Sequence, residues 1–234
     1  MAIATPPGIG PIGIVRLSGL RSKDLLGRVW KSGASHVDKF VSHRFYYGKV
    51  IDLSTQRDAR IVDEAMAVYF QSPRSYTGEE MVEIYTHGNP FVLEAVVALL
   101  IREGARMAEP GEFTRRAFLH GRIDLSQAEA VADLISASSE KARRCAAEQL
   151  TGRLSAVIRE AVARLTETRA FVEAAIDFPE EDIALLQREA VARRIGELRQ
   201  NLASLAETYR EGRWIREAAR VVLLGRPNAG KSSL

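Results

Sequence analysis

The sequence has a single cysteine and no long apolar run. Cys145 is the only cysteine among 234 residues, so an internal disulfide is excluded and a reducing compartment is favoured. No apolar run approaches the roughly twenty residues that a membrane-spanning helix needs. The first seven residues also lack the basic region and the long apolar region of a secretory signal. We therefore expect no membrane association and a cytoplasmic location.

Patterns for metal binding and nucleophilic catalysis are also missing. His87 has no second histidine or cysteine at metal-ligand spacing, and no Ser/His/Asp or Cys/His order suggests a nucleophile. The net charge is only +3, with arginines and acidic residues interspersed, which indicates solvated helix faces more than a nucleic-acid stripe. We expect no catalytic residue within this sequence. An apolar share of 46% is that of ordinary globular chains.

The clearest motif lies at the end of the sequence. Four apolar residues, 221–224, run into Gly225, and Gly230, Lys231 and Ser232 follow at the G-x-x-x-x-G-K-S spacing of a phosphate-binding loop. A strand delivers the chain to a tight turn whose backbone N–H groups surround a phosphate. The lysine then reaches the outer phosphates, and the hydroxyl takes a Mg²⁺ position. This stretch predicts the first strand and loop of a nucleotide-binding domain.

The first half of the sequence mixes short strands with short helices. Aromatic and β-branched residues predict strands at 12–17, 44–50, 65–70 and 81–85. Ser22 is expected to cap a short helix that reaches about Trp30. Asn89 and Pro90 predict the start of a helix that Gly104 ends. Without long parallel crossovers, this pattern indicates an α+β domain.

The second half has the periodicity of three long helices. A capping box at 126–129 is expected to begin the first, in which Cys145 is expected to be a small packed core residue. The proline of Phe178-Pro179 ends the second. The third has a 4-3-4-3-4 apolar seam. We expect a helical bundle whose seam is partly bare, formed by Val191, Ile195, Leu198, Leu202, Leu205 and Tyr209.

Three charged residues stand in apolar context in or next to the first half. Arg16 lies in the apolar run 14–17, Glu83 lies between Val82 and Ile84, and Arg122 follows residues 118–121 at the junction with the helices. Opposite charges in neighbouring strands usually form a structural ion pair. From the residues alone, that interpretation is favoured over a ligand site.

Seven blocks in order resemble the MnmE/TrmE family of tRNA-modification GTPases. They are Ala-Thr-Pro-Pro-Gly (4–8), Gly-Ile-Val-Arg-Leu-Ser-Gly (13–19), Ser-Tyr-Thr-Gly-Glu-Glu (75–80), Pro-Gly-Glu-Phe-Thr-Arg-Arg-Ala-Phe-Leu (110–119), Asp-Leu-Ser-Gln-Ala-Glu-Ala (124–130), Val-Glu-Ala-Ala-Ile-Asp-Phe-Pro (172–179) and Gly-Arg-Pro-Asn-Ala-Gly-Lys-Ser-Ser-Leu (225–234). Each block alone is weak, but together they span the chain.

The resemblance implies a domain organisation and a function. It implies a folate-binding and dimerising domain at 1–117, similar to that of glycine-cleavage T-protein, half of a helical domain at 118–217, and the start of an α/β GTPase domain at 218–234. Family members are homodimers that act with the flavoprotein MnmG on C5 of the wobble uridine of tRNA. They add an aminomethyl or carboxymethylaminomethyl group, with GTP hydrolysis driving the cycle.

The resemblance also implies the ligands and their residues. Arg16, Glu83 and Arg122 would contact 5-formyl- or 5,10-methylene-tetrahydrofolate, the one-carbon source. GTP would be held by Asn228, Ala229, Gly230, Lys231, Ser232 and Ser233. Within that set, Asn228 would bind K⁺ and Ser232 would bind Mg²⁺. By itself, the 234-residue chain is expected to bind a reduced folate and to hydrolyse no GTP, because the loop lacks its sheet and helix.

Some positions depart from the family pattern, and other functions remain open. Ile9 stands where many members have arginine, Thr86 and Asn89 replace glycines, and Arg122 stands where lysine also occurs. The alternatives are a stand-alone folate-binding or dimerisation module, a one-carbon transferase without GTPase activity, and a ribosome-assembly GTPase with the same loop. The last leaves the folate-like first domain unexplained.

Overall fold

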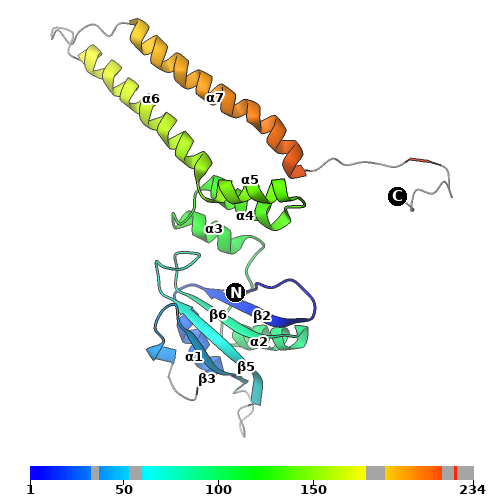
Figure 1. Cartoon of the computed structure of the whole chain (residues 1–234). Coiled ribbons are helices and arrows are strands. Elements are labelled where there is room, and N and C mark those ends of the chain that lie inside the picture. Colours follow the sequence, from blue (N-terminus) through cyan, green and yellow to red (C-terminus); the bar gives the residue numbers. More distant parts are fainter. Residues whose placement is uncertain (33–36, 53–59, 178–187, 218–223, 226–234) are drawn as a thin grey trace. The chain divides into compact units, whose positions relative to one another are not determined.

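The computed structural model describes residues 1–32, 37–52, 60–177, 188–217 and 224–225. It divides into two compact units, residues 1–123 and 124–234, which are described separately (Figure 1). The predicted phosphate-binding loop at 225–234 lies almost wholly outside the described residues. None of the helices in the described ranges is both long enough and apolar enough to cross a membrane.

The first unit is built on a six-stranded antiparallel sheet with the strand order β1-β2-β6-β5-β4-β3. The α+β prediction for this half of the chain is therefore confirmed. Each predicted strand is present, and most extend beyond the predicted ends. The strands are β1 (Ala2–Ile3), β2 (Gly10–Ser18), β3 (Trp30–Lys31), β4 (Phe45–Asp52), β5 (Arg60–Phe70) and β6 (Met81–Gly88).

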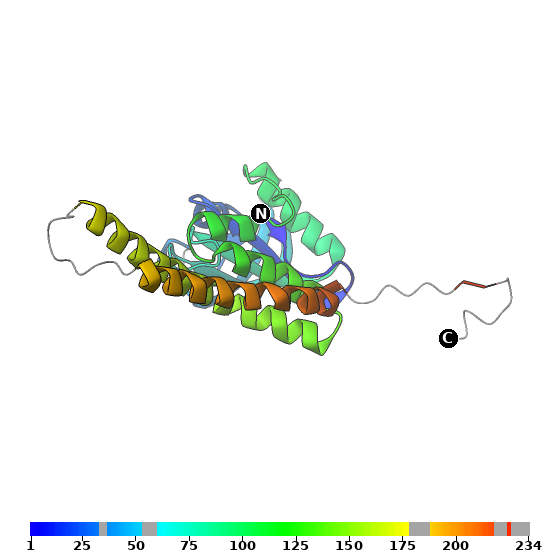
Figure 2. The same cartoon turned by 90° about the horizontal axis from the view of Figure 1, so that it is seen from above.

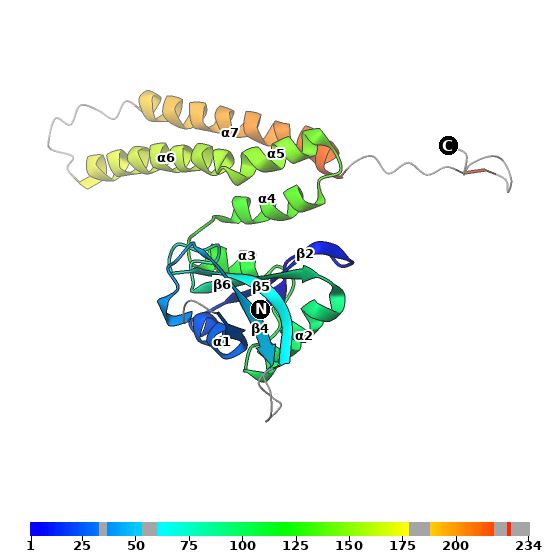
Figure 3. The same ribbon diagram turned by 60° about the horizontal axis from the view of Figure 1, so that its bottom comes forward.

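Two helices, α1 (Ser22–Val29) and α2 (Pro90–Arg102), cover one face of this sheet (Figure 3). Their buried leucines and valines pack on the inward-facing residues of β2, β5 and β6, among them Val15, Ala67 and Ile84. As predicted, Asn89 caps α2, and its side chain accepts a hydrogen bond from the Phe91 N–H. The opposite face of the sheet, which carries Arg16 and Glu83, is not covered by α1 or α2.

The prediction that Ser22 caps α1 is wrong. Arg21 occupies the N-cap position without a side-chain hydrogen bond, and Ser22 is the first helical residue, with a buried hydroxyl. The backbone N–H of Ser22 donates to Gly19, whose positive φ of 128° makes the tight turn after β2. The turn geometry therefore moves the helix start by one residue.

A third helix, α3 (Glu112–Leu119), completes the first unit, and four more make up the second. They are α4 (Leu125–Ser136), α5 (Glu140–Leu150), α6 (Arg153–Asp177) and α7 (Arg188–Glu217). The helices α6 and α7 lie side by side in every view (Figure 2). The helical prediction for this half is confirmed. The Phe178-Pro179 stop expected after the second helix lies outside the described residues.

Three expectations about the helices need correction. The region predicted as the first helix forms two helices, α4 and α5, because Ser139 is the N-cap of a new helix. The capping box is formed by Asp124 and Gln127 rather than by residues 126 and 129. Cys145 is exposed, not packed, because α5 buries Ala142 and Ala146 and presents Cys145 to solvent.

The apolar seam of α7 is partly bare, as predicted. Leu198 is buried, whereas Ile195 and Leu202 are exposed. The Arg194 guanidinium lies over the Phe171 ring of α6, 5.8 Å from its centroid. Tyr209, at the end of the predicted seam, lies outside the residues whose side chains are described.

The close approach of β3 to β4 predicts a strong requirement for glycine at position 48. A Cβ on Gly48 would lie 2.5 Å from the Trp30 ring and 2.8 Å from the Lys31 carbonyl oxygen. We expect Gly48→Ala to lower the free energy of unfolding by about 2 kcal/mol. Gly27→Ala is the control. A Cβ on Gly27 would lie 3.9 Å from the nearest atom, so the free energy of unfolding should equal or exceed that of the unmodified chain. Urea denaturation followed by circular dichroism measures both, and equal midpoints would contradict the steric argument.

Candidate functional site

Arg16 and Glu83 meet on the sheet face that α1 and α2 do not cover. They are direct cross-strand partners in β2 and β6, and the Arg16 Nε lies 2.7 Å from the Glu83 Oε1. The Glu83 side chain is only 8% exposed, against 37% for Arg16. A buried carboxylate needs a cation or hydrogen-bond donors to offset the loss of hydration. The structure thus brings together two of the three residues expected to contact folate.

The ion pair is not fully satisfied by the protein itself. The Arg16 Nε is buried and has no hydrogen bond of acceptable geometry, despite its short distance to the carboxylate. Within the described part of the chain, Glu83 is the only partner of the Arg16 side chain. The other guanidinium N–H groups are therefore available to a ligand. Buried polar groups without full hydrogen bonding are uncommon and often mark functional positions.

Tyr85 holds the second oxygen of the Glu83 carboxylate. Its hydroxyl donates to the Glu83 Oε2 from two residues further along β6, on the same face. Burial and this hydrogen bond raise the pKa of Tyr85 to about 12, which favours the neutral hydroxyl that donates the bond. The Tyr85 ring meets the Phe45 ring edge to face, with 5.2 Å between centroids. An aromatic wall therefore stands next to the carboxylate.

Arg122, the third expected contact, does not touch this pair. It is exposed and lies against the loop between β5 and β6, where a Cβ on Gly78 would be 3.2 Å from the Arg122 Cγ. No ion pair in the described ranges includes it. The positive φ of 78° at Gly78 and the nearby His120 side chain, 3.1 Å from the same Cβ position, leave room only for glycine there.

The loop that supports Arg122 is tied to β2 close to Arg16. The Ser18 hydroxyl donates to the Glu79 Oε2 at 2.7 Å and lies 2.7 Å from the Thr77 hydroxyl. Ser18 is two residues from Arg16 and therefore points from the same face of the sheet. The His120 Nδ1 lies 2.9 Å from the Thr77 carbonyl oxygen, which fixes the segment before Arg122 to the same loop. These hydrogen bonds connect the 75–80 loop to the end of β2 and to the segment before Arg122.

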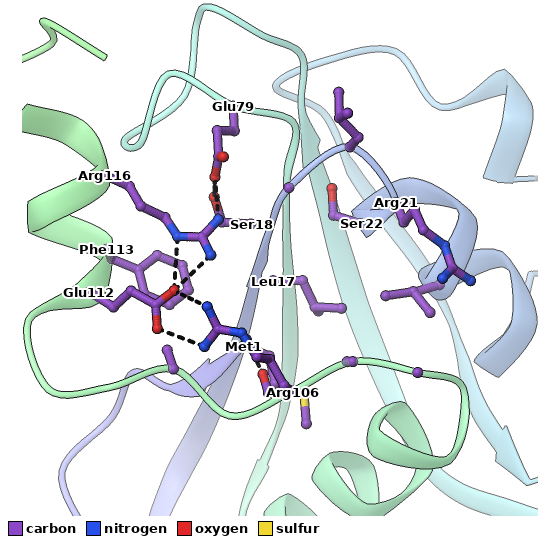
Figure 4. Close-up of a pocket in the computed structure, with 16 residues that line it drawn as sticks. Met1, Leu17, Ser18, Arg21, Ser22, Glu79, Arg106, Glu112, Phe113 and Arg116 are labelled. Atoms are coloured by element: carbon purple, nitrogen blue, oxygen red, sulfur yellow. Dashed lines mark hydrogen bonds and ion pairs between the residues drawn. The ribbon is translucent and has the colours of Figure 1, made fainter. Parts of the chain in front are cut away.

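A charged network closes one wall of a cavity beside this loop. The cavity has a volume of about 450 Å³ and lies between the end of β2, α1, residues 104–108 and α3. In Figure 4, Arg106 and Arg116 both point toward Glu112, whose side chain is only 2% exposed. Arg116 also reaches Glu79 at 2.8 Å. The carboxylates are thus saturated by arginines, and the network anchors α3 to the loop.

Sequence reasoning missed Tyr85, Glu112 and Arg116 as parts of this region. Glu112 and Arg116 lie in the block 110–119, where their i,i+4 spacing on a helix is a usable signal. Tyr85 alternates with Glu83 on one strand face, which also points to proximity. The hydrogen-bond partners themselves come from different strands and helices, so no local pattern reveals them.

His87 pairs with Asp63; the sequence predicted no metal-binding role for this histidine. Its Nδ1 lies 2.8 Å from the Asp63 Oδ1, and its backbone N–H donates to the Asp63 Oδ2. No group of three histidine, cysteine or acidic side chains gathers as a metal site in the ranges that the structure covers. The residues expected to hold GTP, K⁺ and Mg²⁺, from Asn228 to Ser233, lie outside the described residues.

Comparison with known proteins identifies the family. A model described as the N-terminus of the GTP-binding protein TrmE matches residues 1–122, and a model of the MnmE helical domain matches residues 125–220. The chain belongs to the TrmE/MnmE family. This finding agrees with the resemblance in the seven sequence blocks.

Full-length MnmE proteins support the same assignment. The whole chain is 45% identical over 234 residues to the tRNA modification GTPase MnmE of Aquifex aeolicus. It is 47% identical over 233 residues to that of Geobacter sulfurreducens and 42% identical over 235 residues to that of Bacillus subtilis. In each comparison, the chain spans about half the length of the MnmE relative. The similarity therefore covers the N-terminal and helical regions of MnmE.

The Glu112 network predicts a specific loss of stability in acid. Hydrogen bonds from Arg106, the Glu109 N–H and Arg116 lower the pKa of Glu112 well below its ordinary value of 4.5. Because the pKa is lowered on folding, the stabilisation is complete above about pH 4.5 and disappears as the pH falls below it. We expect Glu112→Gln to cost about 2 kcal/mol of unfolding free energy at pH 7, and the deficit to shrink at about pH 3.5.

Urea denaturation at the two pH values measures this difference. Glu103→Gln is the matched control, because its ion pair with Arg28 is exposed and should change stability by less than about 0.5 kcal/mol. A pH-independent deficit in Glu112→Gln would show that the loss does not come from the ionised carboxylate.

Proposed function

We propose that the first unit binds a reduced folate at Arg16 and Glu83, with Arg122 at the rim. The observation that carries the proposal is the partly unsatisfied ion pair on the exposed sheet face. A pterin ring presents an N–H and an amino group side by side, and a carboxylate accepts both. The free guanidinium N–H groups of Arg16 suit a carbonyl oxygen of the ring or a carboxylate of the glutamate tail. Together, these groups match both parts of the ligand.

Each of the three residues has a separate part in this proposal. Glu83 orients the pterin, because a buried and fixed carboxylate accepts hydrogen bonds in one direction only. Arg16 forms an ion pair with that carboxylate and adds donors beside it. Arg122 offers an exposed guanidinium from the other side of the 75–80 loop, suited to a carboxylate of the tail. The bound folate would supply a one-carbon unit, and these residues would hold it in place.

For the complete protein, we propose the tRNA modification that the family resemblance implies. The group would be added to C5 of the wobble uridine together with the flavoprotein MnmG, and GTP hydrolysis with Mg²⁺ and K⁺ would drive the cycle. The proposal is supported by the two family models, by the similarity to tRNA modification GTPases named MnmE and by the G-x-x-x-x-G-K-S spacing at 225–232. Under it, Asn228 to Ser233 would hold GTP.

The uncovered sheet face favours dimerisation through the first unit. Phe45, Tyr47 and Met66 are all exposed on this face, and Phe45 is 55% exposed. Apolar side chains gathered on one sheet face are typical of association surfaces. A dimerisation module without folate binding is the second candidate function, and a folate titration separates it from the first.

The folate proposal predicts saturable binding that depends on Glu83. The 234-residue chain should bind 5-formyltetrahydrofolate in isothermal titration calorimetry, and Glu83→Gln should weaken binding roughly 10- to 100-fold through loss of charged hydrogen bonds. Glu64→Gln is the matched control. Glu64 also pairs with a lysine and a tyrosine on this face, but its side chain is 52% exposed. Absence of saturable binding by the unmodified chain would favour the dimerisation module.

A further inference from the structure

We propose that Tyr85 is a positioning residue for the pterin, acting through Glu83 and, with Phe45, forming the wall against which the ring lies. The inference rests on the proposed folate function and extends it to a residue outside the three expected contacts. Under this proposal, Glu83, Tyr85 and Phe45 select one part of the ligand. That part is a flat heterocycle with paired N–H donors on one edge.

The first step of the argument is the geometry of the Glu83 carboxylate. One oxygen lies 2.7 Å from the Arg16 Nε, and the other accepts the Tyr85 hydroxyl. A carboxylate has about four acceptor positions, so two remain for a ligand. With one oxygen held by Arg16 of β2 and the other by Tyr85 of β6 itself, the carboxylate cannot rotate freely. Its remaining acceptor positions are therefore fixed before any ligand arrives.

The second step is the shape of the surface beside that carboxylate. In the strand register, Tyr85 lies between Ile14 of β2 and Met66 of β5. Its ring contacts Phe45 edge to face across β5. Aromatic and thioether side chains present a polarisable surface for a planar ring. A pterin whose donor edge meets Glu83 would therefore have Tyr85 and Phe45 next to its ring.

The third step compares Tyr85 with a similar cluster on the same face. Tyr47 donates to Glu64 at 2.6 Å, and Lys49 lies 3.0 Å from the same carboxylate. The chemistry is again one tyrosine, one glutamate and one cation across a strand pair. Glu64 is 52% exposed, however, whereas Glu83 is 8% exposed. In water, a hydrogen bond restricts a carboxylate far less, so only the Glu83 cluster is rigid enough to orient a ligand.

The experiment is a double-mutant cycle on the 234-residue chain. Binding of 5-formyltetrahydrofolate is measured by calorimetry for the unmodified chain, Tyr85→Phe, Glu83→Gln and the double variant. Tyr85→Phe keeps the ring and removes only the hydroxyl, so we expect about tenfold weaker binding. In the Glu83→Gln background, the same change should alter affinity less than about twofold, because Tyr85 acts through the carboxylate. An effect of equal size in both backgrounds would overturn the inference.

Tyr47→Phe is the matched control and should leave affinity within about twofold of the unmodified chain. Circular dichroism melting of every variant tests whether folding is intact. A second variant, Phe45→Leu, should also weaken binding, by removal of an aromatic surface from the wall. If Tyr85→Phe binds as tightly as the unmodified chain, or if Tyr47→Phe loses as much, the inference is wrong.

The outcomes separate this inference from the proposed function. No saturable binding by the unmodified chain overturns both. Saturable binding that Glu83→Gln weakens and Tyr85→Phe does not affect leaves the folate function standing and removes the role of Tyr85.

Discussion

The first unit depends on the register of β2 against β6, which places the Glu83 carboxylate beside Arg16. A one-residue slip would turn every side chain of β2 to the opposite face. Val15 and Leu17 would leave the core, and Arg16 would enter it. The apolar core and the ion pair therefore specify the same alignment. A buried charge on a half-exposed sheet is tolerated because its partner is a direct neighbour in the ladder.

The glutamates near this pair differ in how many of their hydrogen-bonding positions are filled by the protein. Glu112 is almost fully enclosed and saturated by two arginines, so it acts as an anchor for α3. Glu79 is shared between Arg116 and Ser18 and joins that anchor to the end of β2. Glu83 is enclosed, and each of its two oxygens has one partner among the described residues. Glu112, which has several charged partners, supports the structure, whereas each oxygen of Glu83 keeps an acceptor position for a ligand.

Much of this arrangement could be predicted from residue patterns. Aromatic and β-branched residues predicted the strands, and the Asn89-Pro90 pair predicted the start of α2, because both signals are local. The expectation that Arg16 and Glu83 belong together came from charge in apolar context and from the family resemblance. Whether the pair holds a folate stays a prediction.

What patterns could not predict depends on geometry beyond a single element. Ser22 has the right chemistry for a cap, yet the turn at Gly19 places it inside the helix. The N-cap of α4 is Asp124, two residues before the expected one, because the Gln127 side chain accepts a hydrogen bond from its backbone N–H. Cys145 has helical spacing from apolar residues, yet α5 packs through Ala142 and Ala146 and leaves the thiol exposed.

The two tyrosine–glutamate–cation clusters on the sheet show why residue identity alone does not define a site. Their donors and acceptors are alike, and their hydrogen bonds have similar geometry. They differ in the neighbours that exclude water: Glu64 lies on the exposed surface of β5, while Glu83 is enclosed between β2 and β5. Enclosure lowers the local dielectric and strengthens each hydrogen bond to the carboxylate. The remaining acceptor positions of the enclosed Glu83 carboxylate therefore offer a ligand stronger hydrogen bonds than those of the exposed Glu64 carboxylate.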